Sequence, residues 1–165
     1  MNDFPRTLKL ATVWMLIGIA VFLGVSAWQA NESRARIEVS GQTIEIRRSP
    51  DGHYHWPGTV NGRQVDFLID TGATTTTLPQ SLADALELPS LGRVQGSTAN
   101  GPVTGTLTRA DVTLEGGVSL TNLRLMALPA LSAPLLGMNV LSRLQWRQSG
   151  DRLIIESAAP KAGAD

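Results

Sequence analysis

Residues 65–74 read Val-Asp-Phe-Leu-Ile-Asp-Thr-Gly-Ala-Thr, an alternating strand that runs directly into a turn of small residues. The first, third and fifth residues are apolar, and this period of two is typical of a strand with one buried face. The strand delivers Asp70 to its end, where a carboxylate is held rigidly and can still reach solvent or a bound molecule. Gly72 has no Cβ, so another backbone can approach it closely. We therefore expect a β-rich fold, with Asp70 as the candidate catalytic residue.

Asp-Thr-Gly is also an ordinary turn sequence, because Asp and Gly are common in turns whatever the function. A second segment strengthens the functional interpretation. Well downstream the chain reads Leu135-Leu136-Gly137, followed by the short apolar run Met-Asn-Val-Leu. Two apolar residues and a glycine suit a segment that packs closely against another loop.

Together the two segments resemble the single-domain, retropepsin-like aspartic proteases, and most closely a membrane-anchored bacterial subgroup. The resemblance covers about residues 51–156. It implies an all-β fold, a closed acid-protease barrel with two short helices, that acts on a peptide or protein substrate without metal or organic cofactor. The site residues that it implies are catalytic Asp70, an active-site loop and dimer contact of Thr71, Gly72 and Ala73, packing residues Leu135, Leu136 and Gly137, and a candidate flap at Asn100 and Gly101.

The chain departs from the retroviral members at one pair of positions. Those proteins carry an Asp and an Arg, which form an ion pair, where this chain has Thr74 and Met138. Both partners are absent together, so no charge is left unpaired. A dimer of this chain must then be held by other contacts.

Peptide hydrolysis by carboxyl groups needs an acid and a base on one water molecule, and two carboxyl groups about 3 Å apart share a proton to provide both. Asp66 lies on the same strand face as Asp70, but four strand residues separate their backbones by roughly 13 Å. The Asp-Thr-Gly motif occurs once in the sequence. A symmetric homodimer that contributes Asp70 twice supplies the missing carboxylate.

The sequence also allows other function classes to be considered: a peptide-binding module, a serine hydrolase and a metal-binding protein. A non-catalytic member of the same fold could bind extended peptides by strand addition. A serine hydrolase is disfavoured, because the sequence has no Gly-x-Ser-x-Gly and its only histidines are His53 and His55. These two histidines could share a strand face, but without a third ligand nearby we expect no metal site.

Composition excludes further classes. Lys plus Arg and Asp plus Glu both total 14, so no basic excess indicates nucleic acid as a partner. The absence of cysteine excludes a thiol nucleophile, a cysteine-based zinc site and disulfides.

Residues 10–28 contain no charged side chain. As a helix they would span about 28 Å, close to the ~30 Å hydrocarbon thickness of a bilayer. A cleaved signal peptide is the alternative, with Val25-Ser26-Ala27 as a tolerable cleavage site, although the apolar core of such peptides is usually only about 7–15 residues long. We expect an uncleaved, single-pass anchor in the lipid bilayer of a bacterial inner membrane, with the catalytic domain in the periplasm.

The remaining divisions follow from composition. We expect residues 1–9 to form an N-terminal tail, the polar residues 29–50 a linker with a candidate short strand over Ile37–Ile46, residues 51–156 the protease domain, and residues 157–165 a disordered tail. Within the domain, Asn-Gly at positions 61–62 between apolar runs predicts a hairpin. Short helices are predicted after Pro79 and over residues 140–144.

Overall fold

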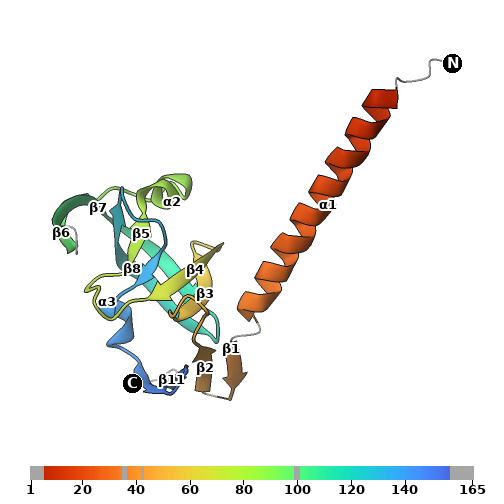
Figure 1. The fold of residues 1–165 in the computed structure, drawn as a ribbon. Helices are drawn as coiled ribbons and strands as arrows, with labels where there is room; N and C mark the ends of the chain where they lie inside the picture. Colours follow the sequence, from red (N-terminus) through yellow and green to blue (C-terminus); the bar gives the residue numbers. More distant parts are fainter. Residues whose placement is uncertain (1–5, 35–36, 42, 99–100, 157–165) are drawn as a thin grey trace. The chain divides into compact units, whose positions relative to one another are not determined.

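The computed structural model describes residues 6–34, 37–41, 43–98 and 101–156 (Figure 1). The chain divides into two compact units, Met1–Ala35 and Arg36–Asp165. The first unit contains helix α1 (Arg6–Arg34). The second contains the strands and the two predicted short helices, α2 (Gln80–Ala85) and α3 (Met138–Leu141).

Helix α1 begins before and ends after the predicted anchor at residues 10–28. Its apolar side chains from Leu10 to Leu23 are exposed. In the described part of the chain, no helix is long and apolar enough to cross a membrane, so the transmembrane anchor is not supported. Residues 6–9 of the predicted N-terminal tail belong to α1, which begins at Arg6. Residues 157–165, predicted to be a disordered tail, lie outside the described residues.

A four-stranded antiparallel sheet joins the two ends of the second unit in the order β1-β2-β11-β10. Its strands are β1 (Ile37–Ser40), β2 (Thr43–Arg47), β10 (Gln145–Ser149) and β11 (Arg152–Glu156). The sequence predicts a linker over residues 29–50, whereas α1 continues to Arg34 and β1 and β2 belong to this sheet. The alternating Ile44 and Ile46 explain the difference, because both are fully buried beside Leu153 and Ile155.

A seven-stranded sheet forms the rest of the unit, in the order β3-β4-β9-β5-β8-β7-β6. Its strands are β3 (His55–Val60), β4 (Arg63–Ile69), β5 (Thr77–Pro79), β6 (Gly92–Thr98), β7 (Gly101–Leu114), β8 (Val118–Leu128) and β9 (Leu135–Leu136). Strand β3 also pairs with β7. The fold is thus mostly β with few short helices, as predicted, while closure into a complete barrel stays a prediction.

The core is one cluster built from alternating strand residues of both sheets. Its largest fully buried side chains include Trp56, Phe67, Leu78, Leu125 and Leu136. The indole of Trp56 donates to the carbonyl oxygen of Glu115 over 2.8 Å, so its one polar atom is satisfied. Phe67 precedes Asp70 on β4, and this packing therefore fixes the strand that carries the candidate catalytic residue.

The seven-stranded sheet contains two hairpins that the sequence predicts. The β3–β4 turn has Asn61 at φ 48° and Gly62 at φ 84°, the left-handed conformations that Asn-Gly favours. The predicted hairpin is therefore confirmed. Strands β6 and β7 form the second hairpin, which ends at the pair Thr98 and Gly101. Of the two candidate flap residues, Gly101 begins β7 and Asn100 lies outside the described residues.

Candidate active site

Asp70 follows the last residue of β4, where the strand meets β9. The two strands run parallel, with Ile69 beside Leu136. The backbone N–H of Asp70 donates to the carbonyl oxygen of Leu136 over 3.1 Å. Asp70 is half-buried, and its Oδ1 accepts from the backbone N–H of Gly72 over 2.8 Å. The strand pairing and this hydrogen bond together orient the side chain.

Gly137 allows α3 to lie against the loop of Asp70, as the motif predicts. A Cβ at Gly137 would lie 2.6 Å from the carbonyl carbon of Thr75 and 2.8 Å from the carbonyl oxygen of Ala73. No side chain fits in that space, so only glycine permits this approach. The structure therefore brings residues 70–75 and Leu135–Gly137 into one closely packed unit.

Thr74 and Met138 occupy the positions of the ion pair in the retroviral proteases. Here the main chain connects these two positions to the packed unit. The N–H of Met138 donates to the carbonyl oxygen of Ala73 over 2.8 Å. The N–H of Asn139 donates to the carbonyl oxygen of Thr74 over 3.0 Å. Backbone hydrogen bonds thus brace the loop without a charged pair.

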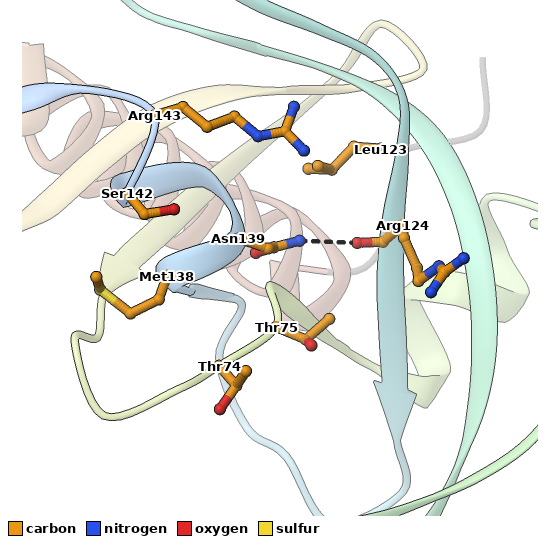
Figure 2. A pocket seen from close by; sticks show the side chains of 8 residues that line it. All are labelled: Thr74, Thr75, Leu123, Arg124, Met138, Asn139, Ser142 and Arg143. Carbon is orange, nitrogen blue, oxygen red and sulfur yellow. Dashed lines mark hydrogen bonds between the residues drawn. The ribbon is translucent and has the colours of Figure 1, made fainter.

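Thr76 and Asn139 form a polar connection that sequence reasoning did not identify. The Asn139 side-chain oxygen accepts from the N–H of Thr76 over 2.8 Å and from its hydroxyl over 2.7 Å. The same hydroxyl accepts from the N–H of Gly137 over 3.1 Å, and Thr76 is fully buried. The Asn139 amide donates to the carbonyl oxygen of Arg124 over 3.0 Å (Figure 2). Two side chains thereby tie the loop, α3 and β8 together. The run of four threonines at residues 74–77 was the only feature of the sequence that could have indicated this hydrogen-bonded connection.

Other predicted site residues lie at the surface of the loop. Thr71 and Gly72 are exposed, and Ala73 is half-buried. The candidate flap hairpin packs on β8, where a Cβ at Gly96 would lie 3.3 Å from the sulfur of Met126.

An open pocket of about 530 Å³ lies beside the loop (Figure 2). It is lined by residues from the loop, from β8 and from the segment around α3: Thr74, Thr75, Leu123, Arg124, Met138, Asn139, Ser142 and Arg143.

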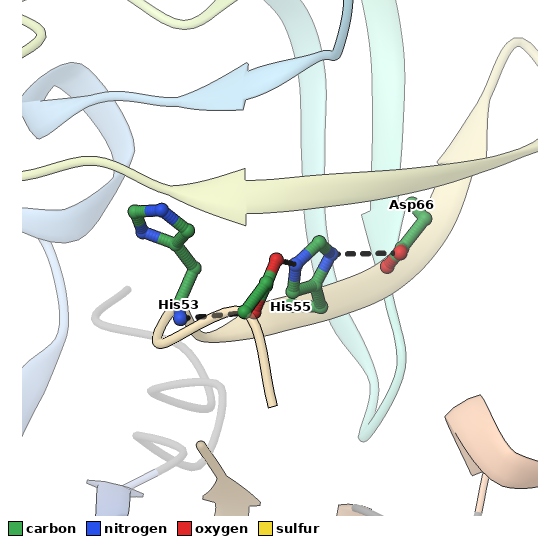
Figure 3. Close-up of polar contacts among 4 residues, drawn as sticks. His53, His55 and Asp66 are labelled. Carbon is green, nitrogen blue, oxygen red and sulfur yellow. Dashed lines mark hydrogen bonds and ion pairs between the residues drawn. The ribbon is translucent and has the colours of Figure 1, made fainter. Parts of the chain in front are cut away.

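His55 joins β3 to two carboxylates (Figure 3). Its Nδ1 lies 2.9 Å from an oxygen of Asp66, and its Nε2 lies 2.9 Å from an oxygen of Asp51. Burial by itself lowers the pKa of His55, but the hydrogen bonds to Asp51 and Asp66 outweigh it and raise the pKa above 6.5. The pKa of Asp51 is lowered from 3.8, chiefly by the N–H of His53 and then by His55.

This cluster also bears on two sequence interpretations. Asp66, which lies on β4 four residues before Asp70, binds His55 and is not the second carboxylate of the site. Within the described ranges, no group of three or more metal-ligating side chains is placed to hold an ion.

Comparisons with known proteins agree with this geometry. Residues 56–143 match the model of a family described as gag-polyprotein putative aspartyl protease, which is more than half of the 165-residue chain. No curated protein matches. A solved retropepsin-like aspartic protease from Rickettsia conorii is 28% identical, with a TM-score of 0.56, and the match covers 74% of this chain and 95% of that one. A second solved structure, EIAV protease complexed with the inhibitor HBY-793, is 19% identical, with a TM-score of 0.47, and the match covers 59% of this chain and 93% of that one.

The family match begins in β3 and ends just after α3, so it contains Asp70, the loop and Gly137. The fold is accordingly the retropepsin-like one. This chain is an aspartic endopeptidase and belongs to the retropepsin-like aspartic protease family.

Proposed function

We propose that the chain hydrolyses peptide bonds with a water molecule activated between two Asp70 carboxylates, one from each copy of a homodimer. The observation that carries the proposal is the setting of Asp70 at the end of a core strand. Gly72 holds Oδ1, and within the described residues no protein donor binds the other oxygen. That oxygen is free to accept a proton from water.

The proposed chemistry is general acid–base catalysis without a covalent intermediate. One carboxylate of the pair accepts a proton from the water, which attacks the peptide carbonyl. The other carboxyl group is protonated and donates to the reacting oxygen, after which a proton passes to the leaving amine. The two groups share one proton because like charges about 3 Å apart are unfavourable.

Two observations support a second copy. The chain has one Asp-Thr-Gly motif, and the nearest carboxylate on its strand, Asp66, is bound to His55. A two-fold axis beside the loop would place two Asp70 side chains face to face. Thr71 is exposed on the same loop and would contact the partner loop across the axis, while Gly72 would contact the substrate backbone.

The strand β10 offers a further surface for pairing between copies. It is the outer strand of its sheet, and all five of its residues are exposed, including Trp146. An exposed outer strand has unpaired backbone groups that can bind a second strand. Its pairing would hold the dimer without the ion pair that Thr74 and Met138 lack.

We also propose, from the sequence, that residues 10–28 attach the chain to a bacterial inner membrane with the domain in the periplasm. The uncharged run and the exposed apolar side chains of α1 support this placement. Alkaline carbonate extraction of membranes tests it: an anchored chain stays with the lipid, and a chain released into the wash contradicts the proposal.

The enzyme proposal is tested with Asp70→Asn. The side chain keeps its shape and loses its basicity, so we expect cleavage of a random peptide library to fall by about 10³-fold or more while the circular dichroism spectrum is unchanged. Cleavage at the wild-type rate would remove Asp70 from its role. A wild-type protein that binds peptides and never cleaves them would favour the non-catalytic alternative.

A further inference from the structure

We propose that the pocket beside the active-site loop is a subsite for an acidic side chain of the peptide substrate, several residues from the scissile bond. Arg124 and Arg143 would bind its carboxylate. The inference rests on the proposed protease function, and it names a substrate preference of that site.

The position of the pocket supplies the first argument. Thr74 and Thr75 line it and continue the loop directly from Asp70. Four residues of chain reach at most about 14 Å. An extended substrate with its scissile bond at Asp70 could therefore place a side chain about three to five residues away in this pocket.

The charges around the pocket supply the second argument. Arg124 comes from β8, and Arg143 reaches from the end of α3 toward Leu123 (Figure 2). No carboxylate lines the pocket. Over the described residues, neither guanidinium forms an ion pair with the protein. Both remain available to a ligand, and arginine is well suited to bidentate binding of a carboxylate.

A third arginine increases the positive charge beside the pocket. Arg109 on β7 is paired directly with Arg124 across the two strands, and both are exposed. Like charges at directly opposite positions destabilise a sheet, and a bound anion relieves that repulsion. Asp111 lies two residues further along β7. Its carboxylate accepts from the N–H of Asn122 over 2.7 Å, and among the described residues it forms no ion pair with Arg109 or Arg124.

The polar lining completes the site. The side chain of Asn139 already has hydrogen-bond partners in the protein. Its oxygen accepts from the hydroxyl of Thr76, and its amide nitrogen donates to the carbonyl oxygen of Arg124. By contrast, the side-chain hydroxyls of Thr74, Thr75 and Ser142 make no hydrogen bond within the described part of the chain. Three hydroxyl donors and two arginines that line a pocket of about 530 Å³ can bind a Glu or Asp side chain and disfavour a basic one.

The first experiment measures whether the enzyme prefers substrates with an acidic side chain. Wild-type protein is incubated with a random peptide library, and products are identified by mass spectrometry. Peptides cleaved well are then remade in pairs that differ only by Glu against Gln at the enriched position. We expect the Glu peptide to have about fivefold or higher kcat/KM, and the ratio to fall to about one in Arg124→Gln and Arg143→Gln.

Arg63→Gln is the matched control, because Arg63 is exposed at the start of β4 and does not line the pocket. This variant should keep the wild-type ratio. A ratio near one in the wild type, or a ratio that survives both pocket substitutions, would overturn the subsite. If wild type and Asp70→Asn cleave the library equally, the protease proposal fails instead.

The second experiment does not depend on cleavage. The Asp70→Asn protein is titrated with an acetylated, amidated peptide containing two glutamates, and with its glutamine counterpart, while the arginine Nε–Hε NMR signals are followed. Binding of the acidic peptide should shift the Arg124 and Arg143 signals and leave Arg63 unchanged. Equal shifts with both peptides, or shifts at Arg63 alone, would contradict the proposal even for a protein without protease activity.

Discussion

The loop after β4 and the β6–β7 hairpin are both rich in Thr and other small residues, yet the structure holds them differently. Against the loop, a Cβ at Gly137 before α3 would lie 2.6 Å from the carbonyl carbon of Thr75. Thr76 within the loop is fully buried, and its hydroxyl makes two hydrogen bonds. Toward the tip of the hairpin, a Cβ at Gly101 would meet nothing within 4 Å, and one at Gly96 would approach mainly the flexible Met126 side chain, whereas at the base of the hairpin a Cβ at Gly105 would lie 2.5 Å from the carbonyl oxygen of Ala127. The comparison shows that similar composition specifies a rigid or an adaptable segment according to what packs across from it.

The largest expected effect is at Gly137. In Gly137→Ala the added methyl group would lie 2.6 Å from the carbonyl carbon of Thr75, so α3 must move away from the loop. We expect a loss of about 3 kcal/mol in the free energy of unfolding and a loss of proteolysis. Urea denaturation measures the first, and peptide cleavage the second. A variant with wild-type stability would show that the loop is not closely packed.

The second effect concerns the hydrogen bonds of Asn139. Asn139→Ala removes the acceptor of two donors of the buried Thr76, and we expect a loss of about 2 kcal/mol. Asn139→Asp is the matched variant, because it keeps an acceptor for Thr76 and loses only the donor to Arg124. Thermal unfolding should rank the alanine variant below the aspartate variant. The opposite order would mean that the contact with Arg124 matters more than the contact with Thr76.

A third, smaller effect depends on pH and on the strand that leads into the loop. Because the pKa of His55 is raised above 6.5 in the fold, its contribution to stability is present below pH 6.5 and is lost as pH rises through the folded pKa. The lowered pKa of Asp51 sets the other limit, since its contribution is lost only as pH falls below 3.8.

The melting temperature of the wild type should therefore exceed that of His55→Gln by more at about pH 5 than at about pH 9. Differential scanning fluorimetry across this range measures the difference. A difference that grows toward alkaline pH would contradict the assignment of both carboxylate contacts to a protonated His55.

The smallest effect is expected in the hairpin. In Gly96→Ala the new methyl group would lie 3.3 Å from the sulfur of Met126, a side chain that can shift by a few tenths of an ångström. The free energy of unfolding should change by less than about 1 kcal/mol. A loss as large as that of Gly137→Ala would remove the distinction between the two segments.

The sequence predicted the parts of the fold that depend on local patterns. Three such patterns are each defined by a few neighbouring residues: the alternation before Asp70, the Asn-Gly turn and the Leu-Leu-Gly segment. In the structure they form a strand, a hairpin turn and a closely packed segment. The contact between Thr76 and Asn139 joins residues 63 positions apart, and no local period indicates it. Strand β10 was missed because all five of its residues are exposed and none alternates toward a core.

The predicted linker illustrates the same limit. The alternation of Ile44 and Ile46 is a local strand pattern, but their burial depends on β11 at the other end of the domain. The pocket arginines were also invisible, because the cross-strand pairing of Arg109 with Arg124 depends on the register of β7 and β8. Long-range pairing therefore separates what a single sequence predicts from what the structure adds.

The central claim is that one active site needs Asp70 from two copies, and a mixing experiment tests it most directly. Wild-type and Asp70→Asn proteins are unfolded together, refolded at constant total concentration and assayed on one peptide. If mixed dimers are inactive, activity should follow the square of the wild-type fraction and fall to about a quarter at equal amounts. Activity that falls in direct proportion, to about a half, would show that each chain cleaves with its own single carboxylate and would contradict the account.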